Sequence, residues 1–171
     1  EPYILRKYGI QFDSEDWKLI KGCTEKQFYD HIYSKFNPSI NRNDLMSESK
    51  VFLKKVFSKE LSFMFGFKEI QKKYKDKYKF ALVTSTGPEL FNHIDKILSI
   101  KKLFDHTFNS SHSTKHKPHP EPYLNAINYF NLKPSECMVI EDSVQGVCSG
   151  KRAGCYVVAL KGSIDEKNFN Y

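Results

Sequence analysis

The sequence has 171 residues and a formal net charge of +7, and 40% of its residues are hydrophobic and 15% aromatic. This length and composition suffice for one domain with a substantial core and a small additional module. No apolar run approaches the roughly 20 residues that a transmembrane helix needs, so we expect no membrane association. The lysines are scattered without interleaved aromatic residues. That pattern is typical of a solvated surface, and it favours small phosphorylated metabolites over nucleic acid as partners.

Four cysteines are widely spaced along the chain, and none forms a Cys-x-x-Cys pair: Cys23, Cys137, Cys148 and Cys155. This spacing favours free thiols in a reducing compartment over a disulfide framework or a zinc site. No signal peptide is visible, and we expect a cytoplasmic protein. We also expect it to be a monomer.

Residues 1–64 are predicted to be helical, because no alternating or short buried β-run interrupts them. Thr24 is a suitable N-cap for a helix whose apolar residues recur every four positions: Phe28, Ile32 and Phe36. A second helix is expected over residues 43–58. We interpret residues 1–64 as a small helical module.

From about Gly66 onward, helical and strand patterns alternate. We expect helix 67–77, buried strand 80–83, helix 88–100, strand 104–108, helix 121–130, buried strand 137–140, a helix to about 153, and strand 155–160. Strands that alternate with helices indicate βαβ crossovers and a parallel sheet, so the predicted fold class is α/β.

Polar residues follow the first predicted strand at Thr84, Ser85 and Thr86, and Gly87-Pro88 opens the next helix. Proline fits a first helical turn, where its missing N–H would be unpaired in any case. Free N–H groups at such a helix start, together with hydroxyl side chains, can bind phosphate. Simple helix capping accounts for the same residues equally well.

A proline-rich loop, residues 115–121, precedes the helix at 121–130. Lys117 stands before Pro118, which favours an extended backbone at the lysine. A lysine held in this way can neutralise a phosphate, although a single Lys-Pro pair carries little meaning. Three nearby histidines are interpreted as loop residues and not as a zinc site: His112, His116 and His119.

Two adjacent acids, Glu141 and Asp142, end the apolar run at residues 137–140. Ligands of open α/β sheets bind at the carboxyl ends of the strands, and hard carboxylate oxygens suit Mg²⁺. Capping of the following helix by acidic or serine side chains is the alternative. The sequence thus places hydroxyl residues, a lysine and a pair of acids after successive predicted strands. Together they predict a site for phosphate and magnesium.

These three segments resemble the second, third and fourth motifs of the haloacid dehalogenase superfamily. The branch that they resemble has a helical cap and includes beta-phosphoglucomutase and phosphoglycolate phosphatase. The resemblance covers nearly the whole chain. It implies a Rossmann-like parallel sheet with helices on both faces at residues 65–171 and an all-helical cap at 1–64. Lys21 and Gly22 resemble the cap loop that faces the substrate.

The resemblance also implies a reaction: attack of an aspartate on a phosphate and hydrolysis of the aspartyl-phosphate, with Mg²⁺ as cofactor. Covalent catalysis divides one difficult displacement into two easier steps. Thr84 would bind the phosphoryl oxygens, with Ser85 and Thr86 beside it, and Lys117 would balance their charge. Asp142 would bind the metal directly, and Glu141 would be a second ligand or hold metal-bound water.

The Asp-x-Asp motif that supplies the nucleophile in this superfamily is not found in the sequence. Asp13 and Asp16 lie in the helical part with no apolar strand before them. We therefore expect the central first strand of the sheet to be missing, the 171 residues to be inactive alone, and the nucleophile to lie upstream in a longer protein.

Three alternatives to a phosphatase stay open. A sugar-phosphate mutase of the same family is disfavoured because Glu25 stands where the mutases resembling this chain carry an arginine. A receiver domain also combines acids, Thr and Lys, but there the acid pair comes first in the sequence. A non-enzymatic binding protein of this fold is compatible with the missing nucleophile.

Overall fold

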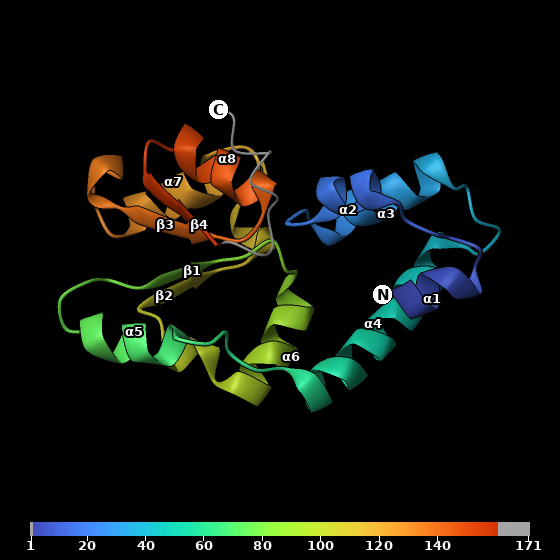
Figure 1. Ribbon diagram of the computed structural model, residues 1–171, viewed down its shortest axis with the longest axis horizontal. Helices are drawn as coiled ribbons and strands as arrows, with labels where there is room; N and C mark the ends of the chain where they lie inside the picture. The colour runs from blue at the N-terminus through green and yellow to red at the C-terminus, as the bar shows by residue number, and fades with distance from the viewer. Residues whose placement is uncertain (1, 161–171) are drawn as a thin grey trace.

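The computed structural model describes residues 2–160, which form a helical part followed by an α/β part (Figure 1). The helical part contains α1 (Pro2–Lys7), α2 (Ser14–Ile20), α3 (Glu25–Lys35) and α4 (Arg42–Glu60). None of the helices described in this range is long and apolar enough to cross a membrane.

Side chains at the helix starts explain where α2 and α3 begin. The Asp13 carboxylate accepts hydrogen bonds from the backbone N–H groups of Glu15 and Asp16, and Asp16 bonds back to the Asp13 N–H. Thr24 and Gln27 form the equivalent reciprocal pair at α3, as the sequence predicts for Thr24. Such pairs satisfy N–H groups that the helix leaves unpaired.

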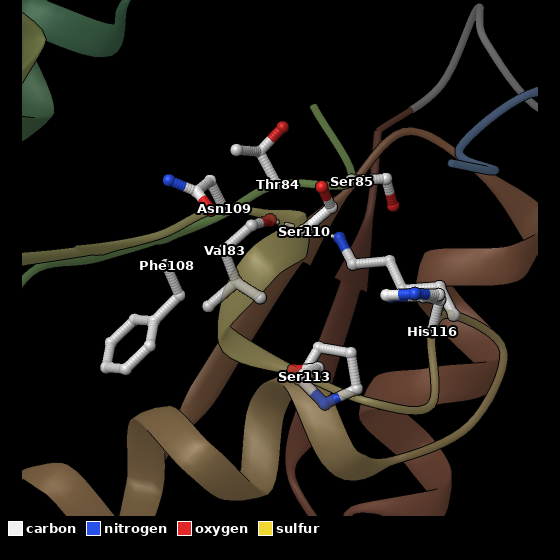
Figure 2. A pocket seen from close by; sticks show the side chains of 10 residues that line it. Val83, Thr84, Ser85, Phe108, Asn109, Ser110, Ser113 and His116 are labelled. Atoms are coloured by element: carbon white, nitrogen blue, oxygen red, sulfur yellow. Dashed lines mark hydrogen bonds between the residues drawn. The ribbon is translucent and has the colours of Figure 1, made fainter. Parts of the chain in front are cut away.

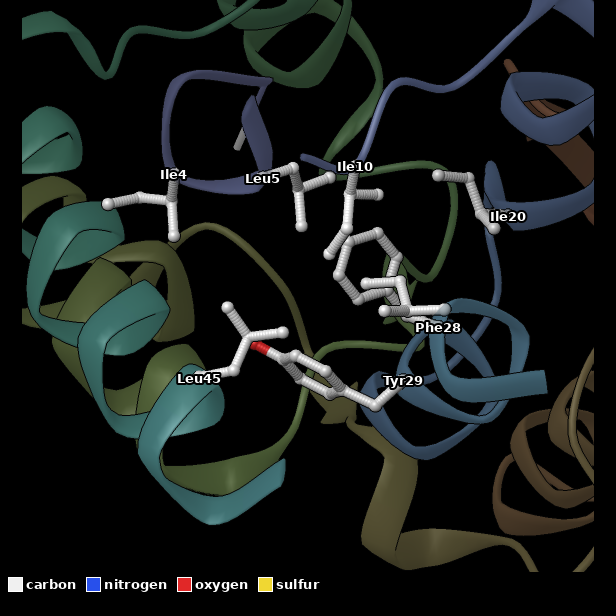
Figure 3. Packing of buried hydrophobic residues seen from close by; sticks show 8 residues of the cluster. Ile4, Leu5, Ile10, Ile20, Phe28, Tyr29 and Leu45 are labelled. Carbon is white, nitrogen blue, oxygen red and sulfur yellow. The ribbon is translucent and has the colours of Figure 1, made fainter. Parts of the chain in front are cut away.

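A cluster of buried apolar side chains holds the helical part together, and Figure 3 shows its members converging from α1, α2, α3, α4 and the segment between α1 and α2. The cluster consists of Ile4, Leu5, Ile10, Ile20, Phe28, Tyr29, Ile32 and Leu45. Ile32 and Leu45 are completely buried. Burying an aliphatic side chain of this size contributes about 1.5–3 kcal/mol, so this cluster is the main source of cap stability.

The α/β part alternates helices and strands in the predicted order. Its elements are α5 (Phe67–Tyr74), β1 (Ala81–Val83), α6 (Pro88–Leu98), β2 (His106–Phe108), α7 (Glu121–Tyr129), β3 (Met138–Glu141), α8 (Val144–Arg152) and β4 (Tyr156–Ala159), with 3₁₀ turns η1 (Ile100–Lys102), η2 (Ser110–His112) and η3 (Pro134–Glu136). Helix α6 ends two residues earlier than predicted, because Ser99 adopts a left-handed backbone conformation with φ of 52°.

The parallel strands form two separate pairs. β1 pairs with β2 in the register Ala81 to His106, and β3 pairs with β4 in the register Met138 to Tyr156. Within residues 2–160 no strand lies between the pairs, although Val83 of β1 packs against the cluster around Val139 of β3. The split agrees with the expectation that the central strand is missing. The predicted boundary between residues 64 and 65 stays a prediction, and the end of the predicted core, residues 161–171, lies outside the described part.

The prediction that strands 80–83 and 137–140 are buried was wrong for β1, where Ala81 is exposed and Leu82 and Val83 are only half-buried, and wrong for one face of β3. In β3 the side chains alternate: Val139 is buried, whereas Met138 and Ile140 are 65% and 54% exposed. α8 covers the buried face, where Gly150 lies against Val139 and Val157. An apolar run predicts a strand, but it does not show whether both faces are covered.

Candidate active site

The segment after β1 is folded back on itself at the start of α6. Thr84 Oγ1 accepts a hydrogen bond from the Thr86 N–H at 3.1 Å and donates one to Thr86 Oγ1 at 2.9 Å. Gly87 is the N-cap of α6, and Pro88 is its first residue. The three hydroxyl residues 84–86 therefore lie where a helix begins, an arrangement that suits an anion.

Lys117 is a buried cation with its ammonium fixed from three sides. Its Nζ donates to the Val83 carbonyl oxygen at 3.1 Å and contacts Glu141 Oε1 in a short ion pair. The same atom lies 4.9 Å from the ring centre of Tyr123. The Lys117–Pro118 peptide bond is cis. A buried charge requires such partners, because desolvating it alone costs several kcal/mol.

Figure 2 shows that the hydroxyl segment and the lysine loop line one small cleft. Thr84 and Ser85 line it from the end of β1, and Lys117 and His116 line it from the loop before α7. The structure thus brings together two segments that lie more than 30 positions apart in the sequence. Ser110, which follows β2, closes the same cleft and donates its N–H to the Thr86 carbonyl at 3.0 Å.

Glu141 is buried in a complete set of hydrogen bonds. Besides Lys117, its carboxylate accepts from the Tyr123 hydroxyl, from Ser143 Oγ at 3.1 Å and from the Asp142 N–H at 3.1 Å. Burial opposes ionisation, but the Lys117 charge and these donors hold the pKa of Glu141 below its usual value. Any Cβ on Gly146 would lie 2.0 Å from the carboxyl carbon, so only glycine fits there.

Asp142, in contrast to the buried Glu141, is about half exposed. The residue that caps α8 is Ser143, whose Oγ accepts from the Gly146 N–H at 3.1 Å. Ser143, and neither of the two acids, therefore caps the helix that follows β3. The Asp142 carboxylate takes no part in this cap and lies at the surface of the site. Its neighbour there is the Lys21 ammonium at 3.7 Å.

The cap loop at Gly22 contacts the core directly. Ser85 Oγ donates to the Gly22 carbonyl oxygen at 2.7 Å. Gly22 has φ of 83°, and a Cβ there would lie 2.5 Å from Ser143 Oγ, so a side chain is excluded both by backbone conformation and by space. Lys21 and Gly22, predicted from the cap sequence, thus lie beside residues of two predicted core motifs.

Two polar contacts at this site were missed by sequence reasoning. The position of Tyr123 in the helix predicted at 121–130 favours burial, but helical spacing does not show where the hydroxyl points. Burial and the Glu141 charge raise the pKa of the Tyr123 hydroxyl, so it remains a neutral donor. Asn109 and Ser110 had a detectable signal, because they are the polar residues that follow the strand predicted at 104–108.

The histidines of the lysine loop are not gathered into a cluster. His112 lies in η2, not in a loop as predicted, with Nδ1 3.1 Å from Asn109 Oδ1, and His119 Nδ1 accepts from the Glu121 N–H. Within the part of the chain that the structure describes, no three His, Cys, Asp or Glu side chains come together as a metal site. The acid left at the surface of the site is Asp142, and a single carboxylate ligand suits a hard cation that keeps several waters.

Comparison with known proteins identifies the family of the chain. The family model described as haloacid dehalogenase-like hydrolase matches residues 2–160. Hexitol phosphatase A of Escherichia coli is 43% identical over 54 residues, covering 32% of this chain and 25% of that enzyme. A pyrophosphatase of Bacillus mycoides is 26% identical over 98 residues, covering 57% of this chain and 46% of that protein. These matches span less than half of either relative's length.

The fold agrees with that of a solved structure. Beta-phosphoglucomutase of Clostridium difficile superposes with a TM-score of 0.75 at 20% identity, covering 97% of this chain and 76% of the other. The family match extends over the cap helices, both strand pairs and every predicted site residue. The chain therefore belongs to the haloacid dehalogenase-like hydrolases, a family of phosphatases and phosphomutases.

Proposed function

We propose that this chain is the phosphate-binding and metal-binding part of a phosphatase that acts on a small phosphorylated metabolite, as a monomer in the cytoplasm. The observation that carries this proposal is the cleft in which Thr84 and Lys117 meet, with Glu141 bonded to the lysine and Asp142 adjacent. The free cysteines of the described chain are compatible with a reducing compartment.

Each residue of the cleft has a role in this proposal. The hydroxyls of Thr84, Ser85 and Thr86 donate to the phosphoryl oxygens, and for this Thr84 and Ser85 exchange their present acceptors, Thr86 Oγ1 and the Gly22 carbonyl oxygen. Lys117 balances the negative charge of the phosphate. Glu141 holds Lys117 in place, and its carboxylate is fully occupied by donors of the protein. Asp142 is the direct ligand for Mg²⁺, and the ion would supply charge neutralisation for the transferring phosphoryl group.

The attacking aspartate is proposed to come from a strand outside the 171 residues. Its place would be between β1 and β3, because Lys117 joins the ends of these two strands and no described strand pairs with either of them on that side. An aspartate at the end of such a strand would emerge beside Lys117. In this proposal that carboxylate attacks phosphorus and the bond to the ester oxygen breaks, which releases the alcohol. Water then hydrolyses the aspartyl-phosphate to inorganic phosphate and the free aspartate.

Glu25 favours a phosphatase over a mutase. A Cβ on Gly87, at the start of α6, would lie 3.9 Å from Glu25 Oε2, so this carboxylate is close to the hydroxyl segment. Lys50 pairs with Glu25 at 3.3 Å and with Glu89 at 3.6 Å, so its one charge is shared between two acids. A negative group here repels a second phosphate on the substrate, which a bisphosphate-dependent mutase has to accept.

The binding part of the proposal is tested by titrating the 171-residue chain with inorganic phosphate at saturating Mg²⁺ in a calorimeter. Thr84→Val and Lys117→Met should each weaken binding about tenfold or more, because charge-assisted hydrogen bonds contribute roughly 1.5–3 kcal/mol. Ser135→Ala, an exposed change in η3, is the matched control and should leave binding unchanged. Binding that survives both site substitutions would contradict the proposal.

The catalytic part is tested with the coding sequence that precedes residue 1. The proposal requires an apolar run followed by Asp-x-Asp there, and turnover of phosphomonoesters by the extended chain with Mg²⁺. Replacing the first of those aspartates by Asn should abolish turnover but keep phosphate binding. Upstream residues without this motif, or tight binding with no hydrolysis by the extended chain, would support a binding protein of this fold instead.

A further inference from the structure

Two cysteines face each other where β3 and β4 begin. These strands lie side by side (Figure 1), and their register pairs Met138 with Tyr156. The residues that precede this pair are Cys137 and Cys155, and the Tyr156 N–H donates to the Cys137 carbonyl oxygen at 3.0 Å. In a parallel ladder the carbonyl of a residue accepts from the N–H that follows the opposite residue, so Cys137 lies opposite Cys155.

The two thiols are on the same face of the strand pair. Side chains alternate along a strand, so Cys137 shares a face with Val139, and Cys155 shares the same face with Val157. Both cysteines pack against the buried cluster that contains Val139, and both are half-buried. Burial raises the pKa of each thiol, and the charge of Cys137 raises the pKa of Cys155 further. Such a charge effect requires that the two sulfur atoms are near each other.

The segments that lead into the two strands are also in contact. Gly154, the residue before Cys155, has φ of 84°, and a Cβ there would lie 3.2 Å from Pro134 Cβ in η3. Opposite residues on neighbouring strands are about 5 Å apart, which is within the range of about 4.4–6.8 Å between the Cα atoms of a disulfide. Cys137 Sγ donates to the Lys133 carbonyl oxygen at 3.4 Å. A thiol is a weak donor, so this bond can be exchanged for a bond to the Cys155 sulfur.

We propose that Cys137 and Cys155 are a modification site, which a low-molecular-weight disulfide such as oxidised glutathione converts to an intrachain disulfide between β3 and β4. The thiolate of one cysteine attacks a sulfur of the reagent, which forms a mixed disulfide and releases one small thiol. The second cysteine, after losing its proton, attacks the sulfur of the first and releases the other small thiol. Two protein thiols are thereby oxidised, and one reagent disulfide is reduced to two thiols.

This site is separate from the candidate active site. The cysteines are at the amino ends of the strands, whereas Glu141 ends β3 and Asp142 follows it. The inference therefore does not rest on the proposed function. Oxidation closes residues 137–155 into a loop that contains α8, which restricts the unfolded chain and stabilises this unit. In a reducing compartment the pair stays as thiols, as in the structure, and the bond forms when the oxidised small thiol accumulates.

Intact-mass measurement tests the bond in a Cys23→Ser/Cys148→Ser variant, which keeps only the proposed pair. After incubation of the folded protein with oxidised glutathione, the mass should fall by two hydrogen atoms with no glutathione attached, and dithiothreitol should restore it. Cys137→Ser and Cys155→Ser in the same background are the matched controls. Each leaves a single thiol, so the reaction should stop at one attached glutathione. Two attached glutathiones, or an unchanged mass, in the variant with both cysteines would overturn the inference.

Thermal unfolding shows whether the bond fits the native fold. The oxidised chain should unfold at a temperature about 5 °C or more above that of the reduced chain, because the bond restricts the unfolded state and matches the native spacing. The Cys155→Ser variant should show no such rise after the same treatment. An oxidised chain whose unfolding temperature stays the same or falls would show that the bond distorts the strands, and the pair would then not be a site for a native disulfide.

Discussion

The Lys21 ammonium of the cap lies 3.7 Å from the Asp142 carboxylate of the core, and both side chains are about half exposed. The contact joins the cap loop to the residue proposed as the metal ligand. A cation at Asp142 would therefore meet the charge of Lys21 as a competitor. If Asp142 binds a metal as proposed, the docking of the cap loop and the binding of the metal would compete for this one carboxylate.

Lys21→Met should raise the affinity of the 171-residue chain for Mg²⁺ by up to about fivefold, because an exposed ion pair of this kind contributes up to about 1 kcal/mol. Calorimetric titration with Mg²⁺ measures the change. Lys59→Met removes an exposed lysine from the end of α4 and controls for net charge. An equal gain in both variants would mean that only the overall charge matters.

Glu141→Gln should lower the free energy of unfolding by about 3 kcal/mol, because it leaves the buried Lys117 ammonium without its counter-charge. Urea denaturation without metal measures this loss. Asp142→Asn is the matched variant, because Asp142 is adjacent and half exposed. This substitution should change the free energy of unfolding by less than about 0.5 kcal/mol and should remove most of the affinity for Mg²⁺. Similar stability losses in both variants would argue against different roles for the two acids.

Tyr123→Phe should destabilise the chain by about 2 kcal/mol, because it removes a buried hydrogen bond to the charged Glu141. Thermal unfolding measures the change. Tyr129→Phe, at an exposed position of the same helix, is the control and should have little effect. Phosphate affinity should fall only modestly, since the Tyr123 ring that packs beside Lys117 is retained.

The cap should lose stability in acid through Asp16. The pKa of this carboxyl is about 2 in the folded chain and 3.8 without the fold, so folding favours its ionised form. The stabilisation is complete above pH 3.8 and is lost as the pH falls toward 2. Because its partner Lys35 is 40% exposed, the contribution is discounted to the order of 1 kcal/mol.

Unfolding of the native chain and of Asp16→Asn, compared between pH 5 and 2, measures this contribution. The gap in stability between the two proteins should narrow as the pH falls. A gap that is constant or widens on acidification would show that the Asp16 charge is not stabilising. The comparison also removes the effect of other acids whose pKa is lowered, such as Glu141 and Asp30.

Local patterns in the sequence predicted the elements well. Thr24 caps its helix as expected, and the helix at Glu121–Tyr129 matches its apolar spacing within one residue. The split sheet was expected from the missing motif and is observed as two strand pairs. The helix cap and the helix bounds depend on residues that are neighbours in the sequence, and the split of the sheet depends on the absence of the Asp-x-Asp motif and its strand.

Contacts between distant segments could not be predicted in the same way. The link from Tyr123 to Glu141 depends on how α7 is rotated over β3, which helical spacing alone does not determine. The pairing of Lys21 with Asp142 depends on how the cap loop docks on the core. The open face of β3 was missed because an apolar run does not show what covers it.

Lys117 bonds to the carbonyl oxygen that ends β1 and to the carboxylate that ends β3, so one side chain joins the two strand pairs. Intolerance of substitution at this position therefore has two sources. A mutational scan scored by protein abundance would mark Lys117 as essential even if the protein catalysed no reaction. Only a scan that measures turnover and abundance separately can distinguish a structural role of Lys117 from a catalytic one.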